Sequence, residues 1–209
     1  MEYVGLNEYL PANNGEYMVK THRLLRDVAE TDLLIIPPPF GDTEKGIRAN
    51  AEAIPYFKQL YEKGSGLASL CIGAFLLTET GLLSGKKCST HRAHVSEFRE
   101  RYPDVEVKDG AVITEHNNIY SSGGANSLWN LVLYLVEKFS DRETAIMISK
   151  YFALDIGRDS QSQFAIFKGQ RNHGDKDIQK VQDYIEAHYP DKLSIEMLAG
   201  IISYRPQNI

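Results

Sequence analysis

A short apolar run that ends at a cysteine and passes directly into a helix-forming run is the feature that most constrains this chain. Residues 67–71 predict a buried strand, and the residues from Ile72 onward predict a helix that stops near Gly85. A cysteine at such a corner has the geometry of a nucleophile elbow. Its place at a helix N-terminus predicts a lowered pKa for the Cys71 thiol, and Gly73 predicts a turn that another group can approach closely.

Predicted strands and helices alternate along the first 155 residues. An apolar run at 32–37 predicts a strand buried on both faces, and residues 46–63 carry continuous helical spacing. The other predicted elements are a short strand at 87–90, a helix at 95–102, β-structure at 105–122, and helices at 128–139 and 141–154, the last capped by Asp141. This alternation predicts a parallel sheet with helices on both faces.

The character of the chain changes after about residue 155. The following stretch is rich in glycine, glutamine and charge, which is typical of a linker. An amphipathic helix is predicted over 177–188, and Ser194 is placed to cap a further short helix. We therefore expect a domain at 1–155, a linker at 156–175 and a truncated helical segment at 176–209.

Composition narrows the class of protein. The formal net charge is −5, from 28 acidic and 23 basic residues, which argues against a dominant nucleic-acid-binding surface on this chain. No apolar run is long enough to span a bilayer and the first residues lack a signal-peptide pattern, so we expect a cytoplasmic protein without a membrane partner. The two cysteines predict no disulfide framework, and no motif predicts a cofactor.

The stretch from Ser69 to His91 resembles the signature of DJ-1/PfpI-like domains, in the version fused to an AraC-type helix-turn-helix in GlxA-like transcriptional regulators. Residues 32–37 and 121–137 resemble the strand before the variable loop and the glycine turn with its long helix in the same family. Residues 145–165 resemble the segment that leads into the DNA-binding region. Residues 193–199 are similar to the first helix-turn-helix of AraC proteins.

The resemblance implies a flavodoxin-like, class I glutamine amidotransferase-like α/β three-layer sandwich followed by a short C-terminal helical fragment. It implies a transcriptional regulator of the AraC type, in which this domain senses a small-molecule effector or dimerises. The implied partners are a second copy of the chain and, in the full-length form, DNA. The DNA-binding residues are not assigned.

Six residues are candidates for lining a ligand site: Cys71, Ile72, His91, Ser122, Gly123 and Gly124. The resemblance places His91 near the pocket, as a partner for the candidate nucleophile Cys71, but a surface or capping histidine is the alternative. Ser122, Gly123 and Gly124 precede a helix and could present backbone N–H groups to an anion, or form only a tight turn.

Three alternatives stay open. A cysteine-dependent hydrolase, amidase or hydratase would need a base beside Cys71, and none is visible in the sequence. Catalytic PfpI-type members have His where this chain has Ile72, and prolines at 37–39 cannot supply oxyanion N–H donors. A DJ-1-like redox protein is the second alternative. The third is a zinc site at Cys88, His91 and His94, and there we expect no metal, because these side chains would diverge.

Overall fold

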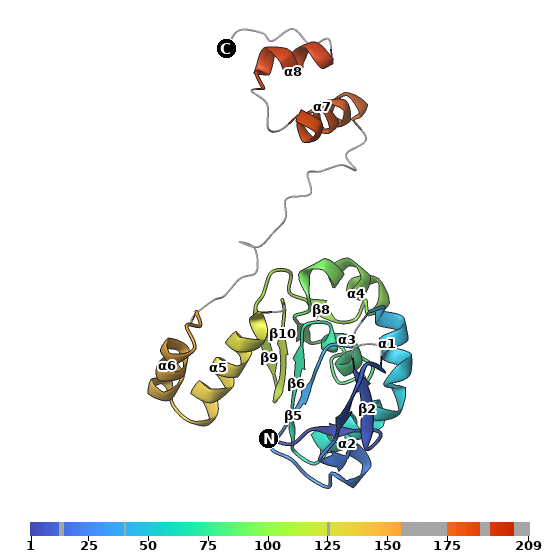
Figure 1. Ribbon diagram of the computed structural model, residues 1–209, viewed down its shortest axis with the longest axis vertical. Helices are drawn as coiled ribbons and strands as arrows, with labels where there is room; N and C mark the ends of the chain where they lie inside the picture. The colour runs from blue at the N-terminus through green and yellow to red at the C-terminus, as the bar shows by residue number, and fades with distance from the viewer. Residues whose placement is uncertain (13–14, 40, 125, 156–174, 189–192, 203–209) are drawn as a thin grey trace. The chain divides into compact units, whose positions relative to one another are not determined.

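The computed structural model describes residues 1–12, 15–39, 41–124, 126–155, 175–188 and 193–202. The chain separates into two compact units, Met1–Gln163 and Phe164–Ile209. The first unit holds a sheet with its covering helices, and the described residues of the second include helices (Figure 1). None of the helices in these ranges is long and apolar enough to cross a membrane.

Four strands form the main sheet of the first unit, in the order β5-β6-β10-β9. They are β5 (Leu33–Ile36), β6 (Gly66–Leu70), β10 (Ile119–Ser122) and β9 (Ile113–His116). The first three run parallel, and β9 pairs antiparallel with β10 across a turn at Asn117 and Asn118, both at positive φ. This pairing confirms the predicted parallel sheet. Apolar strands in such a sheet are stable only when both of their faces are covered.

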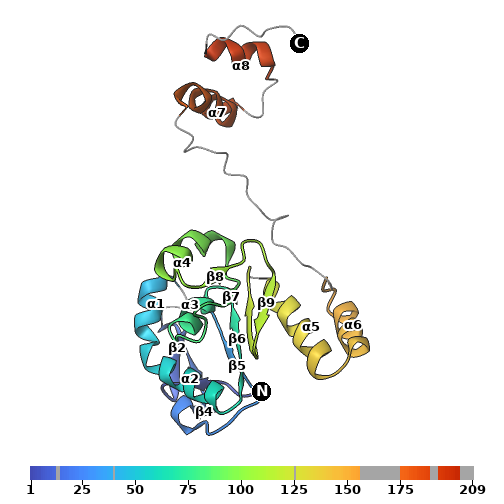
Figure 2. The ribbon, with the colours of Figure 1, turned by 180° about the vertical axis from the view of Figure 1, so that it is seen from behind.

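Helices cover both faces of this sheet (Figures 1 and 2). One face is covered by α1 (Thr43–Ala49), α2 (Ile54–Glu62), α3 (Gly73–Thr78) and α4 (Val95–Arg101). The other is covered by α5 (Ser127–Phe139), with α6 (Arg142–Tyr151) beside α5. Side chains alternate along β6, so that Leu67 enters the first core and Ala68 the second. This is the predicted three-layer α/β sandwich.

The prediction of one continuous helix over 46–63 is wrong. Helix α1 ends at Ala49, a 3-10 turn follows at Ala51–Ala53, and α2 begins at Ile54. The break lies just before Pro55, which has no N–H to continue the hydrogen-bond ladder of a preceding helix.

The helix after Cys71 is also shorter than predicted. It ends at Thr78, whose hydroxyl donates to the carbonyl of Ala74. The chain then turns at Gly81, where φ is +75°, and again at Gly85, where φ is +67°. A threonine hydroxyl that competes for backbone carbonyls weakens a helix end, and glycine readily takes the left-handed conformation that stops it.

Short strands complete the first unit. Strand β1 (Val4–Gly5) pairs in parallel with β4 (Arg23–Leu24), and β7 (Lys87–Cys88) pairs in parallel with β8 (Glu106–Val107). Between β1 and β4, the strands β2 (Tyr9–Ala12) and β3 (Tyr17–Lys20) form an antiparallel hairpin. The sequence pattern predicted β7 and β8 but none of the elements before residue 32.

The second unit contains α7 (Lys176–His188) and α8 (Ile195–Ile201). The predicted cap is confirmed, because Ser194 Oγ accepts a hydrogen bond from the N–H of Met197 at 3.2 Å. No residue of either helix is buried. The proposed domain limits at 155 and 176 stay predictions, and residues 156–174 lie outside the described residues.

Candidate functional site

Cys71 occupies the corner between β6 and α3 with a φ of +55°. Its N–H donates to the carbonyl of Ser122 at 3.0 Å, and its own carbonyl accepts from Thr90 Oγ1 at 3.3 Å. A positive φ costs a residue with a side chain on the order of 1–3 kcal/mol, so the surrounding structure must hold it in place. The strand, strained corner and helix together have the geometry of a nucleophile elbow.

The elbow packs tightly against the end of β5. A Cβ placed on Gly73 would lie 2.6 Å from the carbonyl oxygen of Ile36 and 2.9 Å from that of Pro37. Both neighbours are backbone atoms, which cannot move aside as a flexible side chain can. The predicted close approach at Gly73 is therefore confirmed, and the carboxyl ends of β5, β6 and β10 meet at the corner that carries Cys71.

The predicted lowering of the Cys71 pKa is wrong. The thiol is half-buried, and burial raises its pKa above the ordinary value. The backbone N–H of Ile72 opposes this by interacting with the sulfur, but it is the smaller effect. The following helix has only six residues, which limits the dipole that was expected to favour the thiolate.

The second cysteine lies in a different environment. Cys88 is fully buried, and burial raises the pKa of its thiol to about 12. Its sulfur contacts the carbonyl of Ser89 at 3.4 Å, within the core. The other two residues of the zinc hypothesis, His91 and His94, are partly exposed, and their rings contact each other edge to face with centroids 6.0 Å apart. No group of three metal-binding side chains is found among the residues the structure describes.

His91 caps the short helical turn at Arg92–His94. Its Nδ1 accepts a hydrogen bond from the N–H of Ala93 at 3.2 Å, which matches the capping alternative. Burial and the nearby His94 lower the pKa of His91, so the neutral imidazole is favoured. Because Nδ1 accepts a bond, the neutral ring carries its proton on Nε2. In this arrangement His91 can donate a hydrogen bond through its Nε2–H, but its acceptor nitrogen is already occupied by the N–H of Ala93.

The glycine turn after β10 has a structural role as well as a position near Cys71. The Ser122 carbonyl holds the elbow N–H, while the N–H of Gly123 donates to the carbonyl of Val112 at 2.9 Å. The N–H of Gly123 is therefore already hydrogen-bonded within the domain. Gly124 is partly exposed, and its carbonyl accepts from the N–H of Ser127 at the start of α5.

A polar chain beside His91 was not predicted. The hydroxyl of Thr43 donates to Glu97, and the other carboxylate oxygen of Glu97 lies 2.9 Å from His94 Nδ1. Burial alone would raise the pKa of Glu97, but the hydrogen bonds from Thr43 and His94 outweigh it and hold the pKa below its usual value. The three-residue spacing of His94 and Glu97 could have indicated the pair, but nothing in the sequence pointed to Thr43.

The sequence profile of the DJ-1/PfpI family matches residues 2–138. The regulators GbdR and CdhR of Pseudomonas aeruginosa, both described as HTH-type transcriptional regulators, are 24% identical over 153 residues and 28% identical over 144 residues. These matches cover 73% and 68% of this chain but 41% of each relative, so the chain spans about two-fifths of their length.

Solved structures share the fold. A protein from Vibrio parahaemolyticus, provisionally described as a transcriptional regulator, superposes with a TM-score of 0.65 at 22% identity. The superposition covers 72% of this chain and 78% of that one. The profile match over most of the first unit, the elbow geometry at Cys71 and this superposition agree, and the chain belongs to the DJ-1/PfpI family.

Proposed function

We propose that this chain is part of an AraC-type transcriptional regulator, in which the DJ-1/PfpI domain senses a small molecule and dimerises. The observation that carries the proposal is the pairing of a family domain with a separate unit that holds the Ser194-capped α8. The similarity of the chain to GbdR and CdhR supports it, since both are described as transcriptional regulators.

The site around Cys71 fits binding better than catalysis. Nucleophilic catalysis by cysteine needs a thiolate and an oriented base. Burial disfavours the thiolate of Cys71, and His91 has its acceptor nitrogen occupied by Ala93. We propose that Cys71, Ile72, His91, Ser122, Gly123 and Gly124 border the effector site, which the polar chain at His94 and Glu97 extends.

The partners proposed for the whole regulator are a second copy of this chain and DNA, and the proposed location is the cytoplasm. A net charge of −5 leaves little capacity to neutralise phosphates, so this chain by itself should bind DNA weakly. Titration against labelled duplex at low salt tests this point. Submicromolar binding that weakens steeply with salt would contradict it.

The experiment that tests the regulator is a transcriptome comparison. Deleting the gene should change a small set of transcripts, and reintroducing the gene should restore them. A His91→Ala variant should restore them incompletely or lose the response to the effector, whereas Arg92→Ala, on the exposed neighbour, should behave as the unchanged gene. A deletion that leaves every transcript unchanged would contradict the proposal.

One observation favours a cysteine-dependent hydrolase as the second candidate. A half-buried thiol at a φ of +55° is the strain expected at a nucleophile elbow. Iodoacetamide should label Cys71 faster than Cys88, because Cys88 is fully buried and its thiolate is strongly disfavoured. We expect no amide hydrolysis from either thiol. Amide hydrolysis by the unchanged chain that is lost in Cys71→Ser would show that the protein is a cysteine-dependent hydrolase.

A further inference from the structure

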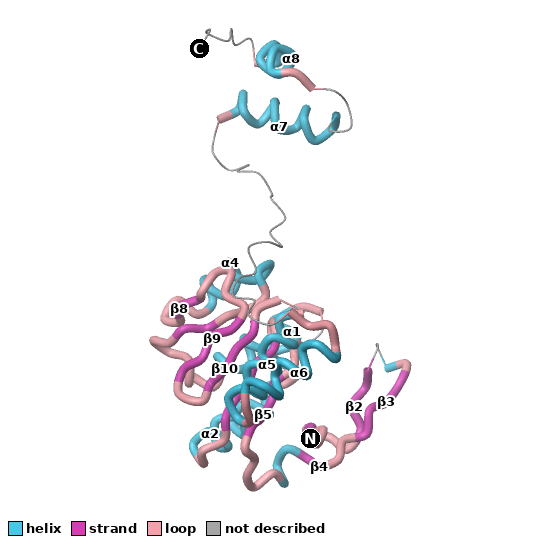
Figure 3. The backbone as a smooth tube through the Cα atoms, turned by 90° about the vertical axis from the view of Figure 1, so that its left-hand side faces the viewer, coloured by secondary structure: helices cyan, strands magenta, loops and turns pink. Residues whose placement is uncertain are grey.

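Two partly exposed imidazoles lie in contact just before α4. The rings of His91 and His94 meet edge to face, and the ring of His94 also meets Phe75 of α3 edge to face with centroids 6.3 Å apart. Helix α4 lies beside the start of α1, to which it is hydrogen-bonded (Figure 3). The two histidines therefore lie against the helix that follows Cys71, where a ligand can reach them.

The Nδ1 atoms of the two rings have opposite hydrogen-bond partners. His91 Nδ1 accepts from the N–H of Ala93, whereas His94 Nδ1 lies 2.9 Å from Glu97 Oε2. Burial would raise the pKa of Glu97, but the hydrogen bonds from Thr43 and His94 outweigh it and favour the carboxylate form. A carboxylate only accepts hydrogen bonds, so the proton of this contact is on His94 Nδ1.

The Nε2 atoms of the two rings consequently differ in the group they present. A neutral imidazole has one N–H, and the bond made by one nitrogen decides which nitrogen carries it. Nε2 is therefore a donor in His91 and a bare acceptor in His94. It points away from the Nδ1 partner in each ring, and no described residue forms a hydrogen bond with either Nε2 atom. Two side chains of one type thus present a donor and an acceptor.

We propose that this donor at His91 and this acceptor at His94 select the effector, which carries a neutral group with an N–H donor beside a C=O acceptor. The inference rests on the proposed function, because it names the chemical class that the regulator senses. A carboxylate offers no donor to His94, and the charges of Glu97 and its neighbour Asp42 repel it. A cationic amidine offers no acceptor to His91. Sites of this kind reject a ligand that leaves a polar group unpaired.

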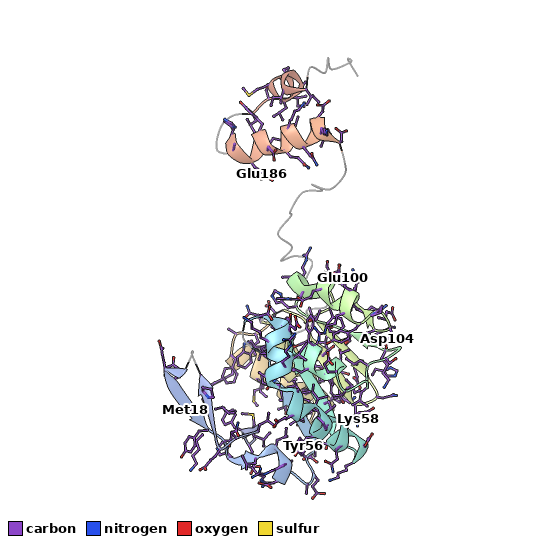
Figure 4. The ribbon with its side chains drawn as sticks, turned by 90° about the vertical axis from the view of Figure 1, so that its right-hand side faces the viewer. Met18, Tyr56, Lys58, Glu100, Asp104 and Glu186 are labelled. Carbon is purple, nitrogen blue, oxygen red and sulfur yellow. The ribbon has the colours of Figure 1, made fainter. Side chains whose placement is uncertain are left out.

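Glu97 acts in this arrangement as a positioning residue for the His94 tautomer. The Thr43 hydroxyl donates to one oxygen of Glu97, so in Glu97→Gln the amide oxygen takes that place and the amide N–H group faces His94 Nδ1. His94 should then carry its proton on Nε2 and become a second donor. Glu100, labelled in Figure 4, is exposed on the same helix, and Glu100→Gln is the matched control.

The tautomers can be measured directly in the unchanged chain. Long-range proton–nitrogen correlation spectra at about pH 8, above the ordinary pKa of histidine, should show the proton on Nδ1 of His94 and on Nε2 of His91. The signals are assigned by their loss in His94→Gln and His91→Gln. Glu97→Gln should move the His94 proton to Nε2, and Glu100→Gln should leave it in place. An Nε2–H on both rings of the unchanged chain would overturn the proposal.

Three probes of nearly the same shape test the ligand class: acetamide, acetate and acetamidinium. They offer a donor with an acceptor, acceptors alone and donors alone. Titrated into the full chain and followed at the His91 and His94 signals, acetamide should bind at least about threefold more tightly than either of the others. Glu97→Gln should reverse the order of acetamide and acetate, and Glu100→Gln should keep it.

Equal binding of the three probes, no response to acetamide, or an order that Glu97→Gln leaves unchanged would each overturn the proposal. These failures are distinguishable from a failure of the regulator. Neither the tautomers nor the order of the probes depends on the transcripts that change when the gene is deleted. An unchanged transcriptome would contradict the regulator, and with it the effector, even where the tautomers are as expected.

Discussion

The two units of this chain contain similar helices but differ in what those helices bury. In the first unit Phe75, Leu77 and Phe98 are fully buried beneath the sheet. In the second unit no residue of α7 or α8 is buried, and Met197 is 47% exposed. In both units, helices form where the amphipathic spacing and the capping residues predict them. The difference teaches that these local signals are enough to place a helix, whereas stability depends on burial by long-range packing, which among the described residues is seen in the helices of the first unit and not in α7 or α8.

The largest expected effect comes from emptying the core of the first unit. Phe75 packs edge to face on Phe98 with ring centroids 4.9 Å apart, and Phe75→Ala should lower the free energy of unfolding by about 4 kcal/mol. The control Met197→Ala in the second unit should cost less than about 1 kcal/mol. Urea unfolding followed by near-UV circular dichroism measures both. Equal losses would break the comparison between the units.

A smaller effect is expected from adding a single methyl group at the elbow. Gly73→Ala places a Cβ against backbone oxygens and should destabilise the first unit by about 3 kcal/mol. Gly200→Ala is the matched change in α8, where a Cβ meets nothing within 4 Å, and it should stabilise that helix by up to about 1 kcal/mol. Thermal unfolding of the two variants tests the pair. An unchanged midpoint for Gly73→Ala would mean that the elbow is looser than the structure indicates.

A cap should matter in the second unit because no residue of α8 is buried. Ser194→Ala removes the acceptor for the Met197 N–H and should cost about 1 kcal/mol of local stability. Amide hydrogen exchange should therefore speed up across α8 and stay constant in the first unit. Ser194→Asp, which keeps an acceptor, should preserve the protection. Faster exchange in β6 would show that the two units are coupled.

Acidification should produce the smallest effect. Burial tends to raise the pKa of Glu115, but the hydrogen bonds from Lys138 and Tyr134 prevail and hold it below its usual value. A carboxyl with a lowered folded pKa stabilises the fold above its unfolded pKa, and this stability is lost as the pH falls through the folded pKa. In that range the midpoint of thermal unfolding of the first unit should fall as the pH is lowered. It should fall less steeply in Glu115→Gln than in the unchanged chain. Identical pH profiles would exclude this contribution.

Much of the fold could be predicted from local patterns. The apolar run at 32–37, the corner at Cys71, and the caps at Asp141 and Ser194 all lie where the sequence placed them. These features depend on burial periodicity and on side chains that bond their own neighbouring backbone, which are short-range effects. The errors at Pro55 and Thr78 were helix ends, where a single residue outweighs an otherwise continuous pattern.

The candidate site was predictable only in part. The sequence indicated Cys71, His91 and the turn at Ser122 as neighbours, and the structure links Cys71 to Ser122 through a backbone hydrogen bond. It did not indicate that Thr43 reaches Glu97, because those residues are 54 positions apart. Nor did it indicate that the hairpin before residue 32 extends from the domain (Figure 3), and it left open whether His91 faces Cys71 or caps a turn, as the structure shows it doing.

The sequence by itself determined the strand, the sharp corner at Cys71 and the close approach at Gly73, because these follow from the apolar run, the helix-forming run after it and residue size. The electrostatic state of the corner was decided by tertiary structure alone. Helix position predicted a lowered pKa for Cys71, but the pKa depends on how much water the packed layers remove from the thiol, and burial raises it. Burial is a property of elements brought together from distant parts of the chain, so no local pattern can report it.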